Sequence, residues 1–247
     1  MLRLIVSDGI TTSFDTATLN ISDTFTFAPV ADGAADGYLV VLNAAQTVIE
    51  IRDTPTNTLI TSVPKAGTNS LVFTGNTDNE TLTIDFTNTT PIPASLGLTF
   101  NAGGGTDGIV YRNGTVGTVA ETYATANNGS TAIDARVVTY TGLESLSDTL
   151  TAPTLSFTYT GGNETVTLQN LVAGTSLQIA STIGVTTSFN KPTDSTTITL
   201  QTGSTDTLNI TSATLAGNFS VNGSDGNDNV NVNGAVAVSA GATLPGL

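Results

Sequence analysis

Apolar and polar residues alternate one by one in short runs along this chain, and a turn rich in glycine or asparagine precedes most of the runs. Each run begins with an acidic residue and a small residue, after which every second position is apolar. The copies begin at Asp23, Asp36, Glu80, Asp107, Glu164, Asp206 and Asp228. Strict alternation is the pattern of a half-buried β-strand, so the sequence predicts a succession of turns and strands.

Repeated strands and turns without helices between them predict an all-β protein, and the favoured fold is a parallel β-helix or β-solenoid. The acidic positions are 27 residues apart from Glu80 to Asp107, 42 apart from Glu164 to Asp206, and 22 apart from Asp206 to Asp228. These intervals lie near one or two multiples of about twenty residues, the usual coil length of a solenoid. A β-sandwich is the alternative, because it needs alternation but no constant period. The 57 residues between Asp107 and Glu164 indicate an insertion or unrecognised coils.

We expect a single elongated domain over residues 1–247. The candidate internal boundary lies near residues 55–69, where Pro55, Pro64 and Gly67 interrupt the pattern. Before this boundary, three strand-like runs are predicted at residues 2–6, 17–27 and 38–53.

One stretch is compatible with a helix. Residues 119–127 contain several alanines and one glutamate before Asn128 and Gly129, and a short helix or another strand are equal alternatives there.

The polar character of the chain comes from hydroxyls and amides, because only 11% of the residues are charged and 38% are hydrophobic. Threonine is abundant, and its branched side chain packs well on a pleated surface. Pairs such as Thr197 and Thr199 share one face of a strand and point away from the apolar residue between them. Their uneven spacing favours a solvated threonine face over an ice-binding array.

The formal net charge is −14, from six basic and twenty acidic residues. This charge repels a phosphate backbone, so we expect no nucleic-acid partner. No run of eighteen apolar residues is present, so we also expect no membrane-spanning helix. Histidine, cysteine and tryptophan are absent and the basic residues are scattered singly, so we expect no enzymatic activity.

A glycine-rich run near the C-terminus resembles the nonapeptide of RTX proteins, Gly-Gly-x-Gly-x-Asp-x-apolar-x, except at the second glycine. The run begins at Gly223, contains Asp225 and Asp228, and continues into Val230. In that family, turn carbonyls and the aspartate of stacked repeats bind calcium. The resemblance implies a calcium site with Asp228 as a side-chain ligand and carbonyl ligands from Gly223 and Asp225, and a second partial copy at Asp107. The copies are isolated, so the alternative is that these residues only form tight turns.

The phrases from Ser70 to Gly234, including Pro91-Ile-Pro93 and the run from Gly97 to Asp107, resemble repeat modules of large secreted bacterial surface proteins. These include planctomycete-type repeat proteins and adhesins of the autotransporter kind. The resemblance implies an extracellular or cell-surface location and a structural or adhesive role, and it transfers no functional residue.

The sequence shows no amphipathic helix that would cap either end of a solenoid. Uncapped strand edges pair with other strands, so we expect the chain to contact flanking modules of a longer polypeptide or to join copies of itself head to tail into filaments. The alternative function is a calcium- or carbohydrate-binding module, with surface glycans as the ligand.

Overall fold

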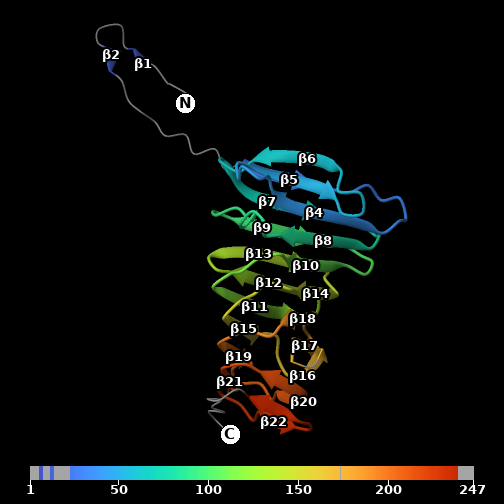
Figure 1. Ribbon diagram of the computed structural model, residues 1–247, viewed down its shortest axis with the longest axis vertical. Coiled ribbons are helices and arrows are strands. Elements are labelled where there is room, and N and C mark those ends of the chain that lie inside the picture. Colours follow the sequence, from blue (N-terminus) through green and yellow to red (C-terminus); the bar gives the residue numbers. More distant parts are fainter. Residues whose placement is uncertain (1–5, 8–11, 14–22, 173, 239–247) are drawn as a thin grey trace.

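The computed structural model describes residues 6–7, 12–13, 23–172 and 174–238. Among these residues every regular element is a β-strand, and the strands from β3 to β23 stack along one long axis in two facing sheets (Figure 1). The predicted all-β class is therefore confirmed.

The sheet that we call sheet I has nine strands in the order β21-β19-β15-β11-β12-β13-β9-β7-β3. Their bounds are β3 (Asp23–Phe27), β7 (Thr68–Thr74), β9 (Gly97–Asn101), β11 (Thr118–Thr125), β12 (Asn128–Ile133), β13 (Arg136–Thr141), β15 (Thr154–Tyr159), β19 (Ser195–Thr199) and β21 (Asn218–Asn222).

The sheet that we call sheet II has twelve strands, in the order β22-β20-β16-β17-β18-β14-β10-β8-β4-β5-β6, with β23 paired to β20. Their bounds are β4 (Asp36–Leu42), β5 (Val48–Asp53), β6 (Leu59–Pro64), β8 (Glu80–Asp85), β10 (Gly108–Arg112), β14 (Ser145–Asp148), β16 (Thr165–Val172), β17 (Ser176–Ser181), β18 (Thr186–Asn190), β20 (Thr207–Leu215), β22 (Asn229–Val232) and β23 (Val236–Val238).

The chain crosses repeatedly from one sheet to the other, as in β7-β8-β9-β10 and β19-β20-β21-β22, and strands of successive coils pair in parallel. This is the β-solenoid that the sequence favours. Three antiparallel meanders, β4-β5-β6, β11-β12-β13 and β16-β17-β18, interrupt the coiling within one sheet. Each meander reverses the chain twice and so restores its original direction.

The meanders account for the irregular period. The long interval between Asp107 and Glu164 contains β11, β12, β13 and β14. Residues 119–127 fall largely in β11, where Val119, Glu121 and Tyr123 alternate toward the interior. The strand alternative is thus confirmed and the helix alternative is wrong.

The predicted single run over residues 38–53 is a hairpin of β4 and β5. It was wrong as one strand because Asn43 ends β4 with a side-chain turn, in which its Oδ1 accepts the amide protons of Thr47 at 2.9 Å and Val48 at 3.1 Å. Gln46 adopts a positive φ of 58° in the same turn. Residues 55–69 hold the β5–β6 turn, β6 itself and the crossing to β7.

Of the predicted runs at residues 2–6 and 17–27, residues 2–5 and 17–22 lie outside the described residues. The described part near the N-terminus includes a separate antiparallel pair, β1 (Val6–Ser7) and β2 (Thr12–Ser13).

The core lies between the sheets as one continuous apolar cluster that extends from Tyr38 in the first coils to Val221 in the last. Aromatic rings join the two sheets, and the ring centroids of Phe157 in sheet I and Phe189 in sheet II are 4.9 Å apart. Outside the core, hydroxyls of neighbouring strands contact one another, as between Thr197 Oγ1 and Ser220 Oγ at 3.0 Å. Alternation therefore separates an apolar interior from a hydroxyl-rich surface, as predicted.

Candidate functional site: a carboxylate column at one edge

Every crossing from sheet I to sheet II among the described residues ends on an acidic residue that begins or immediately precedes a strand of sheet II. We call this set the carboxylate column. Its members are Asp36, Glu80, Asp107, Glu144, Glu164, Asp206 and Asp228. Six of the seven acidic positions found in the sequence pattern belong to it, and Asp23 instead begins β3 of sheet I.

Strand register places these acids next to one another. Asp36 pairs with Glu80, and Thr81 pairs with Gly108, so that Asp107 follows Glu80 in the stack. Equivalent pairings continue the column from Asp107 to Glu144, and from Glu164 through Asp206 to Asp228. The two segments are separated by β17 and β18, which the chain enters by hairpins and not from sheet I.

Backbone hydrogen bonds link the acids of each segment. The carboxylate of a later coil accepts the amide proton of the acid in the coil before it. The bonds run from Glu80 N to Asp107 Oδ1 at 2.6 Å, Asp107 N to Glu144 Oε2 at 2.7 Å, Glu164 N to Asp206 Oδ1 at 2.9 Å, and Asp206 N to Asp228 Oδ1 at 3.0 Å. Each of these four acceptor carboxylates therefore ties its own coil to the preceding one.

Asparagine side chains one residue earlier link the same coils in the opposite direction, because the oxygen of the earlier coil is here the acceptor. Asn79 Oδ1 accepts the amide proton of Thr106 at 2.7 Å, and Asn163 Oδ1 accepts that of Thr205 at 2.9 Å. The recurring asparagine-acid pair is thus a structural unit of the turn, in which the asparagine side chain accepts a proton from the next coil and the amide of the acid donates one to it.

The central acids of the column are buried, and burial disfavours their charged form. Glu80, Asp107, Glu164 and Asp206 are each less than 5% exposed. Burial and the contact with the Asp107 side chain raise the pKa of Glu80 to about 7. Burial and the neighbouring Asp206 charge raise the pKa of Glu164 to about 8. Burial likewise raises the pKa of Asp107.

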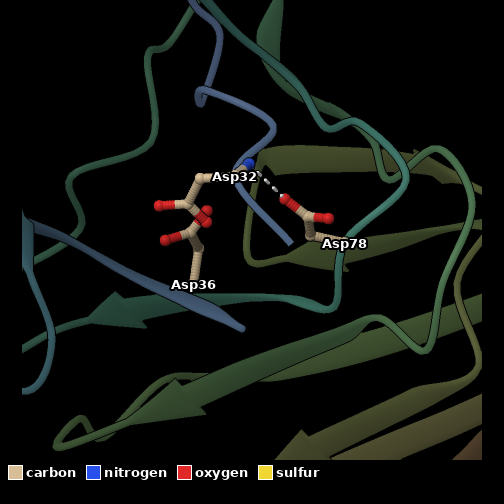
Figure 2. A group of neighbouring side chains, drawn as sticks. All are labelled: Asp32, Asp36 and Asp78. Carbon is tan, nitrogen blue, oxygen red and sulfur yellow. Dashed lines mark hydrogen bonds between the residues drawn. The ribbon is translucent and has the colours of Figure 1, made fainter. Parts of the chain in front are cut away.

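An acidic triad lies at the end of the column nearest β4 (Figure 2). Carboxylate oxygens of Asp32, Asp36 and Asp78 lie within 4.8 Å of one another, and this is the one such group of three found in the described part of the chain. Asp32 is exposed and the other two are half-buried. Asp78 Oδ2 already accepts the amide protons of Asp32 at 2.9 Å and Gly33 at 3.1 Å. Oxygen ligands of this kind suit a divalent cation. The sequence pattern did not indicate the triad, because Asp78 is more than forty residues from Asp32 and Asp36.

The predicted calcium ligands occupy separate parts of this edge. Asp228 lies in the column, and a Cβ on Gly223 would lie 2.5 Å from its Oδ2, so these two residues are together. Asp225 is exposed and its carbonyl oxygen accepts the amide proton of Gly203. Asp107 lies in the other segment of the column, beside Glu80 and Glu144. The structure therefore does not bring Asp107 together with Asp228.

Two further buried acids lie inside the core, on β11 and β14. Glu121 on β11 is 1% exposed, and its Oε2 accepts the hydroxyl proton of Thr131 at 2.8 Å. Burial raises the pKa of Glu121 well above its usual value. Asp148 on β14 is similarly buried, and burial raises its pKa to about 7. Both acids are therefore buried members of the core and not exposed reaction groups.

Two arginines line a hollow of about 460 Å³ on the outer face of sheet II. Both are already paired, Arg52 with Glu50 at 2.8 Å and Arg112 with Asp85 at 2.9 Å. Burial alone would raise the pKa of Asp85, but hydrogen bonds from Thr87 and Arg112 outweigh it and lower the pKa. The positive charges of both arginines in the hollow are therefore compensated by neighbouring carboxylates.

The described residues contain no helix long and apolar enough to cross a membrane. Comparison with protein-family models, curated proteins and solved structures finds no match to this chain.

Proposed function

We propose that the protein is an extracellular structural or adhesive β-solenoid, which acts as a scaffold by stacking on flanking modules or on copies of itself. The observation that carries the proposal is the direction of the four terminal strands. Sheet II ends at β6 and β22, and sheet I ends at β3 and β21. Because each meander reverses the chain twice, the two end strands of each sheet run in the same direction.

A copy shifted along the long axis would therefore meet the end of each sheet with a parallel strand, as inside the solenoid. Two of these terminal strands carry exposed apolar side chains. Leu59 and Ile60 on β6 are 50% and 45% exposed, and Val232 on β22 is 51% exposed. Unpaired edges that carry apolar side chains are sites of strand addition. The extracellular location rests on the resemblance to secreted surface modules.

The test uses the edge of β22. Asn229 and Asn233 donate their amide protons to the neighbouring strand at 2.8 and 2.9 Å, so the amide of Val232, which lies out of phase with them, faces the open edge. Val232→Pro removes that donor without removing a bond to β20, whereas Val232→Thr keeps it.

If copies of the chain stack on one another, electron microscopy and light scattering of the wild type at high concentration should show linear assemblies, which Val232→Pro shortens and Val232→Thr retains. A wild type that stays monomeric at every concentration contradicts self-assembly and leaves flanking modules as the stacking partner. Globular particles without an elongated axis would contradict the scaffold proposal itself.

A further inference from the structure

The two segments of the column differ in how fully their aspartates are hydrogen-bonded. Asp206 Oδ2 accepts the hydroxyl proton of Ser204 at 2.6 Å and the amide proton of Gln201 at 3.1 Å. Asp107 Oδ2 is buried without a hydrogen-bond partner among the described residues. Gly105 stands two residues before Asp107, where Ser204 supplies the hydroxyl to Asp206, and the amide of Ala102, which corresponds to Gln201, donates instead to the Thr141 carbonyl oxygen at 2.8 Å.

Glu80 contributes a second free oxygen at the same step. Its side chain contacts that of Asp107, and its Oε2 is buried without a hydrogen-bond partner in the described structure. Glu80 is 0% exposed and Asp107 is 1% exposed. One oxygen of each carboxylate therefore lacks a hydroxyl or amide donor, whereas Asp107 Oδ1 accepts the Glu80 amide proton at 2.6 Å and Glu80 Oε1 accepts that of Asn76 at 3.3 Å.

A backbone carbonyl lies beside this pair. A Cβ on Gly75 would lie 1.9 Å from the carbonyl oxygen of Ala102 and 2.9 Å from Glu80 Oε2. Because residue 75 is glycine, no side chain separates the carbonyl oxygen from the carboxylate. Three oxygen-bearing groups therefore gather at the Glu80–Asp107 step.

No basic side chain compensates these two carboxylates. The ion pairs found in the described part of the chain join Arg52 to Glu50 and Arg112 to Asp85, outside the column. Two contacting carboxylates in a buried place repel each other when both are ionised, unless a cation is shared between them. A ligand set made only of carboxylate and carbonyl oxygens is the one that calcium prefers.

We propose that Glu80, Asp107 and the Ala102 carbonyl group form a calcium site inside the carboxylate column, between the coils of β8 and β10. The site is distinct from the exposed triad, since its free oxygens are fully buried and Asp78 of the triad is partly used by backbone amides. Water molecules complete the coordination shell, because three protein groups supply fewer than the six to eight oxygens that calcium takes. Calcium bound there ties the two coils together and stabilises the folded chain.

The experiment is thermal unfolding of the full chain at about pH 8, with chelator and then with rising calcium chloride, accompanied by calorimetry for the stoichiometry. The melting temperature should rise by roughly 5–10 °C when free calcium reaches about a hundred times the dissociation constant. Glu80→Gln should abolish the rise while keeping the β-rich circular dichroism spectrum. It should also melt higher than the wild type in chelator, because the repulsion is removed.

Asp32→Asn, which alters the exposed triad, is the matched control and should keep the calcium response. An unchanged wild-type melting temperature up to millimolar calcium would overturn the site and mean that the two carboxylates share only a proton. A response that survives Glu80→Gln but is lost in Asp32→Asn would overturn it in favour of the triad. Neither outcome depends on whether the protein forms filaments, so the scaffold proposal is tested separately.

Discussion

Removing the ionisable group of Glu164 is predicted to flatten the pH dependence of folding stability. Glu164 is 4% exposed, and its surroundings are Asp206 in the next coil, Tyr159 in sheet I and Ser181 on β17. None of these groups carries a positive charge. Burial first, and then the Asp206 charge, raise the pKa of Glu164 from 4.5 to about 8.

The sign of the effect follows from proton binding. Between pH 4.5 and about pH 8 the folded chain keeps a proton on Glu164 that the unfolded chain has released. Stability from this group is therefore complete below the lower value, falls as the pH rises through the window, and is lost above it. One pKa unit corresponds to about 1.4 kcal/mol, so the whole shift sets an upper bound of about 5 kcal/mol. The column lies at the edge of the solenoid, where solvent screening lowers the expected loss to about 2 kcal/mol.

The assay is urea unfolding followed by circular dichroism across this pH range, with chelator present so that metal binding does not contribute. Wild-type stability should fall with rising pH, and Glu164→Gln should remove about 2 kcal/mol of that fall, because the amide resembles the neutral acid in shape. Glu50→Gln, at the half-buried pair with Arg52, serves as the control and should leave the slope unchanged. The reasoning is refuted if Glu164→Gln and the wild type show the same slope, since Glu164 would then be ionised in the folded chain.

Three further substitutions test packing in the solenoid by the change in unfolding free energy. Gly75→Ala places a Cβ 1.9 Å from a carbonyl oxygen of the next coil and should cost about 2–3 kcal/mol. The control Gly104→Ala meets no atom within 4 Å and should change stability by less than about 0.5 kcal/mol. Equal costs for the two variants would contradict the close contact between the coils. Phe157→Ala empties a fully buried position between the sheets and should cost about 3–5 kcal/mol, and a loss below about 1 kcal/mol would show that the core is not packed there. Glu121→Gln should change stability by less than about 1 kcal/mol at neutral pH, because burial keeps the acid neutral. Glu121→Ala should cost about 2–4 kcal/mol, because it leaves a cavity and removes the acceptor of the Thr131 hydroxyl. A large loss of stability in Glu121→Gln would mean that the buried group is charged.

Alternation predicted the fold class and the position of six column acids because side-chain direction along a strand follows directly from local sequence. The seventh, Glu144, was not predicted because its run is broken by Asp148, which stands four residues after the acid where the other copies have an apolar residue. The meanders were not predicted from the sequence either. A strand that pairs antiparallel within its sheet shows the same alternation as one that crosses to the other sheet, so β12 and β17 carry no local signal of their direction.

The carboxylate column could be recognised only from the strand register. Asp107 and Glu80 are 27 residues apart, and only the pairing of β8 with β10 shows that their side chains meet. The calcium interpretation drawn from the RTX-like run looked for adjacent copies along the chain, whereas the structure stacks acids from coils that are 22 to 42 residues apart in the linked steps. The burial of these acids could not be predicted from the sequence either, because the alternating pattern places an acid at the start of a strand without showing which atoms of the next coil cover it.

The direction of the column's hydrogen bonds bears on which stacking partner the proposed scaffold takes. In each linked step the acid of the later coil accepts the amide proton of the earlier one, and Asp228 is the last acid, with no acceptor for its own amide among the described residues. A second copy would bring β6 onto β22, but β6 begins at Leu59 after Asn57 and Thr58, so it offers no acid at that position. A flanking coil that starts with an aspartate or glutamate would accept the Asp228 amide and extend the column. Of the two partners, the column therefore favours a flanking module of the same coil type over a second copy of this chain.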